Sequence, residues 1–149
     1  MNKSMYPIYH EIGHYIVANE IGYEGFLTGS LKNNNNFKFV QTTSVAENII
    51  GLKNQILICF GGLGAEKILS IPINPGHIGD MKIAFDFLRK LYNLENRIFN
   101  FKEFYDFPKE EFDNYLNNSI EILNEYGGSN YLLELGNEFY NYLKNHEGN

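Results

Sequence analysis

A regular apolar stripe near the N-terminus constrains this fold more than any other feature of the sequence. Side chains recur there at steps of three and four residues, as on one buried face of an α-helix: Ile8, Ile12, Tyr15, Ile16 and Asn19. Ser4 suits the N-cap position, Pro7 is tolerated in the first helical turn, and Gly22 is a natural stop. The pattern therefore predicts a first helix over residues 5–21.

This predicted helix contains the sequence His10-Glu11-Ile12-Gly13-His14, an H-E-x-x-H motif. Residues four apart lie on one helix face about 6 Å apart along the axis, so two imidazoles can bind one Zn²⁺. Glu11 projects about 100° round from His10, which places it beside the metal, where it can accept a proton from water. The helical context supports zinc binding. The alternative is a solvent-exposed helix face that carries two histidines by chance.

A catalytic zinc needs a third protein ligand, which leaves one position for water. The extended motif H-E-x-x-H-x-x-G-x-x-H does not continue here, because Val17 replaces its glycine and Glu20 its third histidine. In a continuing helix Glu20 would point about 240° away from His14. Spacing alone does not choose among the remaining candidates: Glu24, Glu47, Glu66, His77 and Asp80.

A small β insert is predicted after the first helix. Residues 25–29 and 37–43 have the pattern of short strands, the second rich in aromatic and β-branched side chains, and the polar tract Asn33 to Asn36 predicts the loop between them. The second strand has two interpretations. It is either an ordinary hairpin arm or an exposed edge that accepts an extended peptide by strand addition.

Most of the remaining chain is predicted to be helical, so the expected fold class is mainly α with a β-hairpin insert. Ser44 and Glu47 form a capping box that would open a helix reaching Leu69. Glycines within that helix indicate close backbone packing against a neighbour: Gly51, Gly61, Gly62 and Gly64. Later helices are predicted over three ranges: 80–92, 108–127 and 129–144.

Length and composition exclude several classes of protein. The 149 residues show no repeat and no linker, so one domain over 1–149 is expected. The net charge of −6 argues against a nucleic-acid binder. A lone Cys59 excludes an intrachain disulfide framework and fits a reducing, cytoplasmic location. The longest apolar stretch, residues 56–65, is too short and too rich in glycine to span a bilayer.

Three segments resemble the FtsH family, the zinc peptidase domain of membrane-anchored AAA+ proteases. Residues 10–18, HEIGHYIVA, resemble its signature H-E-A-G-H-A-x-x-A. Residues 61–69, GGLGAEKIL, resemble its G-G-R-A-A-E-E-I segment, and residues 77–84, HIGDMKIA, resemble G-A-S-N-D-L-x-x-A-T. The blocks occur in the family's order with comparable spacing. There are departures at Leu63, Gly64 and Ile78-Gly79, which replace arginine, alanine and serine-asparagine.

The resemblance implies a role for each matching residue. His10 and His14 would be zinc ligands, Asp80 would supply the third ligand from the start of its own helix, and Glu11 would be the catalytic glutamate. Glu66 would lie near the metal, where it would either orient a histidine or hold the helices together. The family's ATPase module and membrane spans have no counterpart in this sequence. ATP-driven unfolding is therefore not carried over, and an ATPase acting in trans is a candidate partner.

The expected function is that of a zinc metalloendopeptidase acting on flexible or unfolded polypeptides. One alternative is a zinc-binding interaction or regulatory module without proteolysis, and another is a helical protein without metal. Glu11 favours the enzyme, because a pure binding site needs no base.

Other conspicuous residues are expected to have structural roles. His77 is predicted to be an exposed loop histidine, with contact to the site near Asp80 as the alternative. His146 is predicted to be an inert residue near the C-terminus. An aromatic run is expected to complete the core, with a hydrophobic substrate groove as its alternative: Phe99, Phe101, Phe104, Tyr105 and Phe107.

Overall fold

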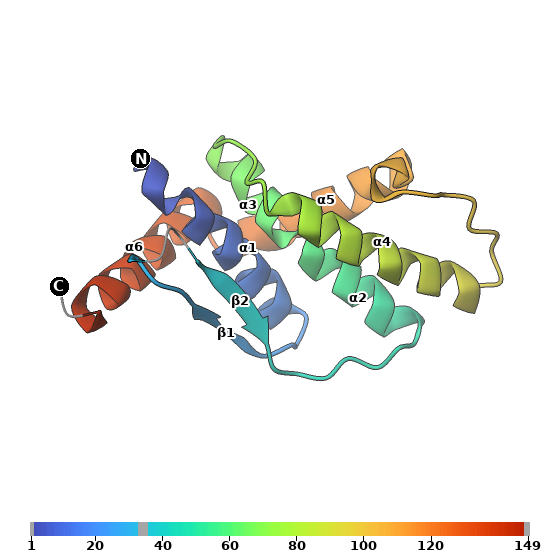
Figure 1. Cartoon of the computed structure of the whole chain (residues 1–149), viewed down its shortest axis with the longest axis horizontal. Helices are drawn as coiled ribbons and strands as arrows, with labels where there is room; N and C mark the ends of the chain where they lie inside the picture. The colour runs from blue at the N-terminus through green and yellow to red at the C-terminus, as the bar shows by residue number, and fades with distance from the viewer. Residues whose placement is uncertain (1, 33–35, 148–149) are drawn as a thin grey trace.

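The computed structural model describes residues 2–32 and 36–147. The fold is mainly helical with a two-stranded antiparallel sheet after the first helix (Figure 1), which confirms the predicted class. The helices are α1 (Tyr6–Glu20), α2 (Ile49–Cys59), α3 (Gly61–Leu69), α4 (His77–Leu94), α5 (Lys109–Glu125) and α6 (Gly128–His146), with 3-10 turns at Lys3–Met5 and Phe104–Asp106. The strands are β1 (Gly25–Thr28) and β2 (Lys38–Gln41).

The hairpin lies along α1, as Figure 1 shows. Leu27 pairs with Phe39 and Gly25 with Gln41, so both strands are shorter than the sequence predicts. Of the polar tract predicted as their loop, residues 33–35 lie outside the described residues. Ser4 is not the N-cap of α1 as predicted, because it belongs to the preceding 3-10 turn.

The prediction of a single helix from Ser44 to Leu69 is wrong at the start of the helix and at its centre. The helix begins at Ile49, because the side chain of Asn48 accepts a hydrogen bond from the backbone N–H of Gly51 at 2.8 Å and takes the capping role. It is interrupted at Phe60, where α2 ends and α3 begins. Two glycines follow Phe60 directly, and glycine is a poor helix former.

Two hydrophobic clusters form the core. The first joins α1, α3, α6 and the hairpin, and the second joins α2, α4 and the segment 99–107. Within the aromatic run, Phe107 is buried and Phe99, Phe101 and Phe104 pack against the second cluster, as predicted for core residues. Tyr105 is the exception, because it is 73% exposed.

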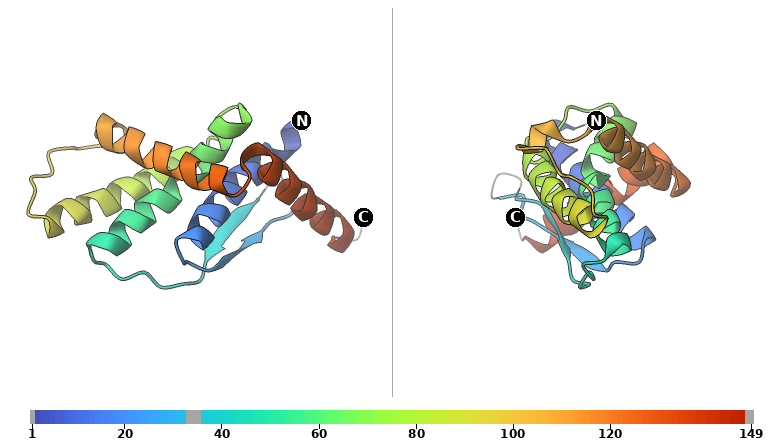
Figure 2. Two further views of the ribbon diagram at one scale, coloured as in Figure 1. Left: turned by 180° about the vertical axis from the view of Figure 1, so that it is seen from behind. Right: turned by 90° about the vertical axis from the view of Figure 1, so that its right-hand side faces the viewer.

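The last two helices, α5 and α6, begin and end within two residues of their predicted bounds. Seen from behind in Figure 2, α5 crosses the molecule and covers α1, α2 and α3. Helix α4 begins at His77, three residues before the predicted start. Among the described residues, no helix combines the length and the apolar character needed to cross a membrane.

Candidate metal centre

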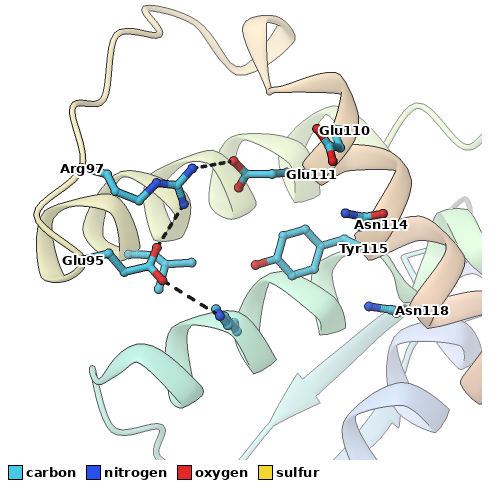
Figure 3. A pocket seen from close by; sticks show the side chains of 9 residues that line it. Glu95, Arg97, Glu110, Glu111, Asn114, Tyr115 and Asn118 are labelled. Carbon is cyan, nitrogen blue, oxygen red and sulfur yellow. Dashed lines mark hydrogen bonds and ion pairs between the residues drawn. The ribbon is translucent and has the colours of Figure 1, made fainter.

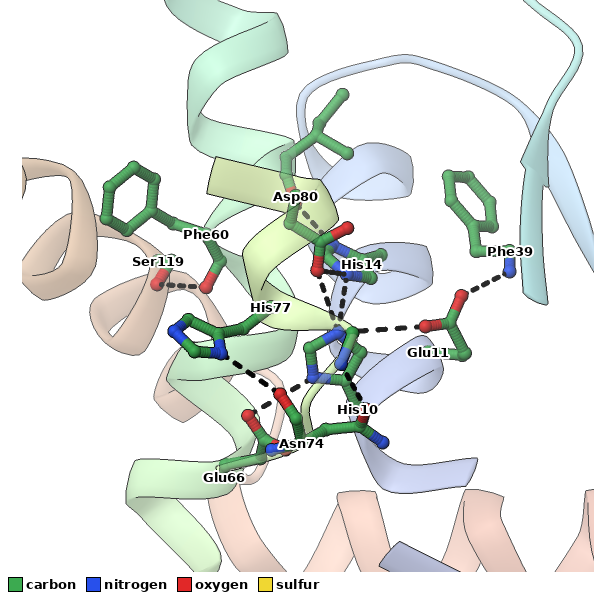
Figure 4. A network of polar contacts seen from close by, with 12 residues as sticks. His10, Glu11, His14, Phe39, Phe60, Glu66, Asn74, His77, Asp80 and Ser119 are labelled. Atoms are coloured by element: carbon green, nitrogen blue, oxygen red, sulfur yellow. Dashed lines mark hydrogen bonds and ion pairs between the residues drawn. The ribbon is translucent and has the colours of Figure 1, made fainter. Parts of the chain in front are cut away.

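The structure brings His10, His14 and Asp80 together, although Asp80 is 66 residues or more from either histidine (Figure 4). The Nε2 atoms of the two histidines are 3.2 Å apart. Oδ2 of Asp80 lies 2.8 Å from Nε2 of His10 and 3.0 Å from Nε2 of His14. Three potential ligand atoms, two nitrogens and one oxygen, therefore converge on one point between α1 and α4.

The second ring nitrogen of His14 has its own partner. Nδ1 of His14 lies 2.7 Å from the carbonyl oxygen of Ile58. A carbonyl only accepts, so Nδ1 carries the proton and the neutral ring presents the lone pair of Nε2 to the cluster. In an uninterrupted helix this carbonyl would accept from the N–H of Gly62. The interruption at Phe60 therefore supplies the acceptor that orients His14.

Glu66 performs the corresponding role for His10. It is 1% exposed, and its Oε1 lies 3.2 Å from Nδ1 of His10. Neither atom makes a hydrogen bond of good geometry in the described part of the chain, so this close contact is the one polar interaction that both atoms have there. Oε2 of Glu66 accepts a hydrogen bond from the backbone N–H of Asn74 at 2.6 Å, and Asn74 lies in the loop that leads into α4. Glu66 thus contacts one ligand and anchors the segment that delivers Asp80.

The donor set fits a divalent metal of the zinc type. In a tetrahedral zinc site with bonds of about 2.1 Å, neighbouring ligand atoms lie roughly 3.4 Å apart. The three distances here, 2.8, 3.0 and 3.2 Å, are slightly shorter than that spacing. With both Nδ1 atoms protonated, three lone pairs face one another, and a cation at their centre would remove this repulsion.

In the metal-free protein, the neighbouring carboxylates raise the pKa of both histidines. Burial lowers the pKa of His10, but its contacts with Asp80 and Glu66 outweigh burial and raise the pKa to about 10. Burial of His14 is likewise outweighed by Asp80, so the pKa of His14 is also raised. Burial of Asp80 is outweighed by hydrogen bonds with both histidines, which hold its pKa well below the usual range. The carboxylates thus favour the protonated histidines when no metal is bound, and a cation would compete with these protons.

Glycines let α1 and α3 approach each other closely enough to build the site. A Cβ at Gly13 would lie 2.1 Å from the carbonyl oxygen of Gly61, so α1 and α3 cross in direct backbone contact. A Cβ at Gly62 would lie 2.4 Å from Cε1 of His10, and the missing side chain makes room for that ring. The close packing predicted at Gly61 and Gly62 is confirmed.

Glu11 lies beside the cluster, on the side of the hairpin. Its Oε2 is 3.7 Å from Nε2 of His10, and its Oε1 accepts a hydrogen bond from the backbone N–H of Phe39 at 2.7 Å (Figure 4). In an antiparallel pair, alternate residues direct their N–H and C=O groups away from the partner strand. The backbone N–H and C=O groups of Phe39 and, by alternation, of Gln41 therefore lie on the free edge of β2 and face the site.

The other predicted candidates lie outside the cluster. Glu47 is exposed and pairs with Lys90 at 2.7 Å, and Glu24 is exposed beside the hairpin. His77 is not an exposed loop residue as predicted: it is half-buried at the first position of α4, and its Nδ1 lies 3.1 Å from the carbonyl oxygen of Asn74. His146 is exposed near the end of α6, with its Nδ1 2.8 Å from the carbonyl oxygen of Tyr142.

A polar pocket of about 440 Å³ lies away from this centre, between α2, α5 and the end of α4 (Figure 3). Its two cations are paired with carboxylates: Arg97 lies 3.2 Å from Glu95 and 3.4 Å from Glu111, and Lys53 lies 4.0 Å from Glu95. The guanidinium of Arg97 also lies over the ring of Tyr92. The pocket contains none of the predicted site residues.

No protein-family model, curated protein or solved structure matches this chain.

Proposed function

We propose that this chain is a zinc-dependent metallopeptidase that hydrolyses peptide bonds in flexible or unfolded polypeptides. The observation that supports this most strongly is the convergence of Nε2 of His10, Nε2 of His14 and Oδ2 of Asp80 within 3.2 Å of one another. Three protein ligands with a fourth position left for water are typical of catalytic rather than structural zinc sites. The resemblance of three sequence blocks to the FtsH peptidase agrees with this choice.

The chain's own residues divide the chemistry between them. His10, His14 and Asp80 would hold the metal, which when bound supplies a Lewis acid that polarises the scissile carbonyl and acidifies water. Glu11 accepts the proton from the attacking water and passes it to the leaving amine. Its position suits this role, because its carboxylate lies beside the ligand atoms and is 17% exposed.

The free edge of β2 supports an extended polypeptide as the substrate. An incoming strand could pair with the groups of Phe39 and Gln41 that face the site, next to the carboxylate of Glu11. Main-chain pairing requires an extended chain, so a folded protein would have to unfold locally before it could bind. This domain should therefore prefer unfolded substrates.

The deciding experiment compares zinc-loaded wild type with Glu11→Gln on one substrate protein, supplied both folded and permanently unfolded. Wild type should cleave the unfolded form and leave the folded form intact, whereas Glu11→Gln should retain the metal and lose cleavage. Glu24→Gln is the matched control, since it removes an exposed carboxylate outside the cluster. A zinc-loaded wild type as inactive as Glu11→Gln would replace the proposal with a zinc-binding interaction module.

A further inference from the structure

The basic side chains of this acidic protein are concentrated in one part of the chain. Five of the twelve Lys and Arg residues lie within residues 82–102, which contain two carboxylates, whereas the whole chain has a net charge of −6. These residues form most of α4 and the start of the segment that leads from α4 to α5 (Figure 1). An anion that approaches the molecule should therefore be attracted to this region.

A pocket of about 430 Å³ opens between the second half of α4 and the segment that follows it. Its lining consists of three cations, one amide and one aromatic ring: Arg89, Lys90, Arg97, Asn93 and Phe99. Within the described part of the chain, no carboxylate lines it. Its volume is in the range of about 300–1,000 Å³ for sites that bind small molecules. A pocket with this lining suits a small organic anion.

Aromatic rings hold both arginines of the pocket in place. The guanidinium of Arg89 lies 5.2 Å from the ring centroids of Phe85 and Phe99, and that of Arg97 lies 3.9 Å from the ring centroid of Tyr92. The chain contains no other arginine, so both of its guanidinium groups line one pocket. A guanidinium is a planar fork that can bind two oxygens of one phosphate, and a fork already held in place loses less entropy on binding.

The ion pairs of these cations leave donors for a ligand. One nitrogen of Arg89 lies 3.3 Å from Asp86, and the ammonium of Lys90 lies 2.7 Å from Glu47. Both carboxylates lie outside the pocket lining and are more than 60% exposed, and ion pairs between exposed groups are weak. The carboxylate partners of Arg97 line the polar pocket of Figure 3 instead. Since arginine has five N–H donors and lysine three, each cation can still donate to a ligand.

We propose that this pocket binds a small organic phosphate monoester, with its phosphate on Arg89, Lys90 and Arg97 and its organic part against Phe99. A phosphate monoester has three acceptor oxygens and close to two negative charges at pH 7, so it can use all three cations. A carboxylate has two oxygens and one charge, and would use fewer of them. The pocket shares no residue with the metal cluster, so this inference does not depend on the proposed peptidase function.

Titration of the full chain with phenyl phosphate at pH 7.5 tests the proposal. A chelator first removes any metal, so that phosphate cannot bind at the candidate metal centre. The chain has two arginines, so its NMR spectrum contains two side-chain Nε–H signals, which Arg89→Gln and Arg97→Gln assign. Both signals should shift in wild type. Each substitution should weaken binding about tenfold or more, because it removes hydrogen bonds between charged groups.

Lys82→Gln is the matched control for charge. It removes one cation from α4 outside the pocket lining and should leave the affinity nearly unchanged. Both arginine side chains are about half exposed, so their substitution should not unfold the protein, which thermal unfolding checks. A loss of affinity in Lys82→Gln equal to that in the arginine variants would show attraction to overall charge alone and overturn the pocket assignment. Titration without a shift of either Nε–H signal would overturn it as well.

Three related anions test the chemistry of the ligand. Phenyl phosphate should bind more tightly than inorganic phosphate, which has no ring to place against Phe99, and more tightly than glycerol 3-phosphate, whose organic part is polar. It should also bind more tightly than phenyl sulfate, which has a similar shape and a single charge. Equal affinity for phenyl phosphate and inorganic phosphate would reject an organic ligand. Equal affinity for phenyl phosphate and phenyl sulfate would reject the phosphate.

Discussion

Oε1 of Glu11 accepts a hydrogen bond from the backbone N–H of Phe39 at 2.7 Å, which joins the candidate base to the edge of the hairpin. The other carboxylate oxygen remains on the side of the metal ligands, 3.7 Å from Nε2 of His10. A peptide that pairs with β2 would use the same N–H of Phe39. The base and the substrate strand therefore share one donor, and the binding of an extended chain is coupled to the position of Glu11.

The stoichiometry of metal binding separates the ligands from the base. Wild type should bind about one Zn²⁺ per chain, because the cluster offers one set of three ligands. His14→Ala should abolish this binding and Glu11→Gln should leave it largely intact. Elemental analysis of the dialysed proteins measures the metal content. Equal loss of zinc in the two variants would make Glu11 a ligand and exclude it as the base.

The two carboxylates beside the histidines, half-buried Asp80 and buried Glu66, should differ in their effect on zinc affinity. Asp80→Asn removes the charge that contacts both Nε2 atoms, so affinity should fall by more than the roughly 10-fold expected for Glu66→Gln, which acts through Nδ1 of His10. Competition with a chromophoric chelator gives both constants. The opposite ranking would identify Glu66 as the third ligand.

Zinc affinity should rise with pH. The pKa of His10 is raised to about 10 in the metal-free protein, so at neutral pH zinc must displace its proton. Affinity should increase about tenfold per pH unit for each proton displaced, and the increase should end once pH exceeds the raised pKa. The metal-free protein should lose stability over the same interval, from pH 6.5 towards 10, because a raised pKa stabilises the fold only while the group is protonated.

Calorimetry in two buffers of different ionisation enthalpy measures this proton release. His77→Gln alters a histidine outside the cluster and should leave the number of released protons unchanged. An affinity that is constant between pH 6.5 and 9 would show that the histidines are already neutral in the metal-free protein.

Gly62→Ala should impair the metal centre by displacing a ligand. The added methyl group would lie 2.4 Å from the ring of His10, so the ring must turn away and zinc affinity should fall by about tenfold or more. Gly79→Ala is the matched control, because a Cβ there meets nothing within 4 Å and alanine favours the helix by up to about 1 kcal/mol. Zinc titration followed by thermal unfolding of both variants tests this; equal affinities would show that the ring can adjust.

The parts of the site encoded by local spacing could be predicted from the sequence. His10, Glu11 and His14 lie within one helix, where a period of 3.6 residues determines their relative positions. Asp80 could not be distinguished by spacing from Glu24 or Glu66, because its position depends on how two distant helices pack. Only the resemblance to a family singled it out.

The supporting contacts were beyond prediction for the same reason. The carbonyl of Ile58 is available to His14 because the chain leaves the helix at Phe60, whereas the pattern of residues 44–69 indicated one continuous helix. The N–H of Phe39 faces Glu11 only in the observed hairpin register, and a shift by one residue would turn it away. Such features depend on tertiary packing rather than on local propensity.

The ligand set joins the two hydrophobic clusters, since α1 belongs to the first and α4 to the second. A metal held by His14 and Asp80 would close a loop of 66 residues in a chain that has a single cysteine. By analogy with a disulfide, such a crosslink reduces the conformational entropy of the unfolded chain and is worth roughly 4 kcal/mol for a loop of this length. The bound metal would thus crosslink the chain as an intrachain disulfide does, and a single cysteine cannot form such a disulfide.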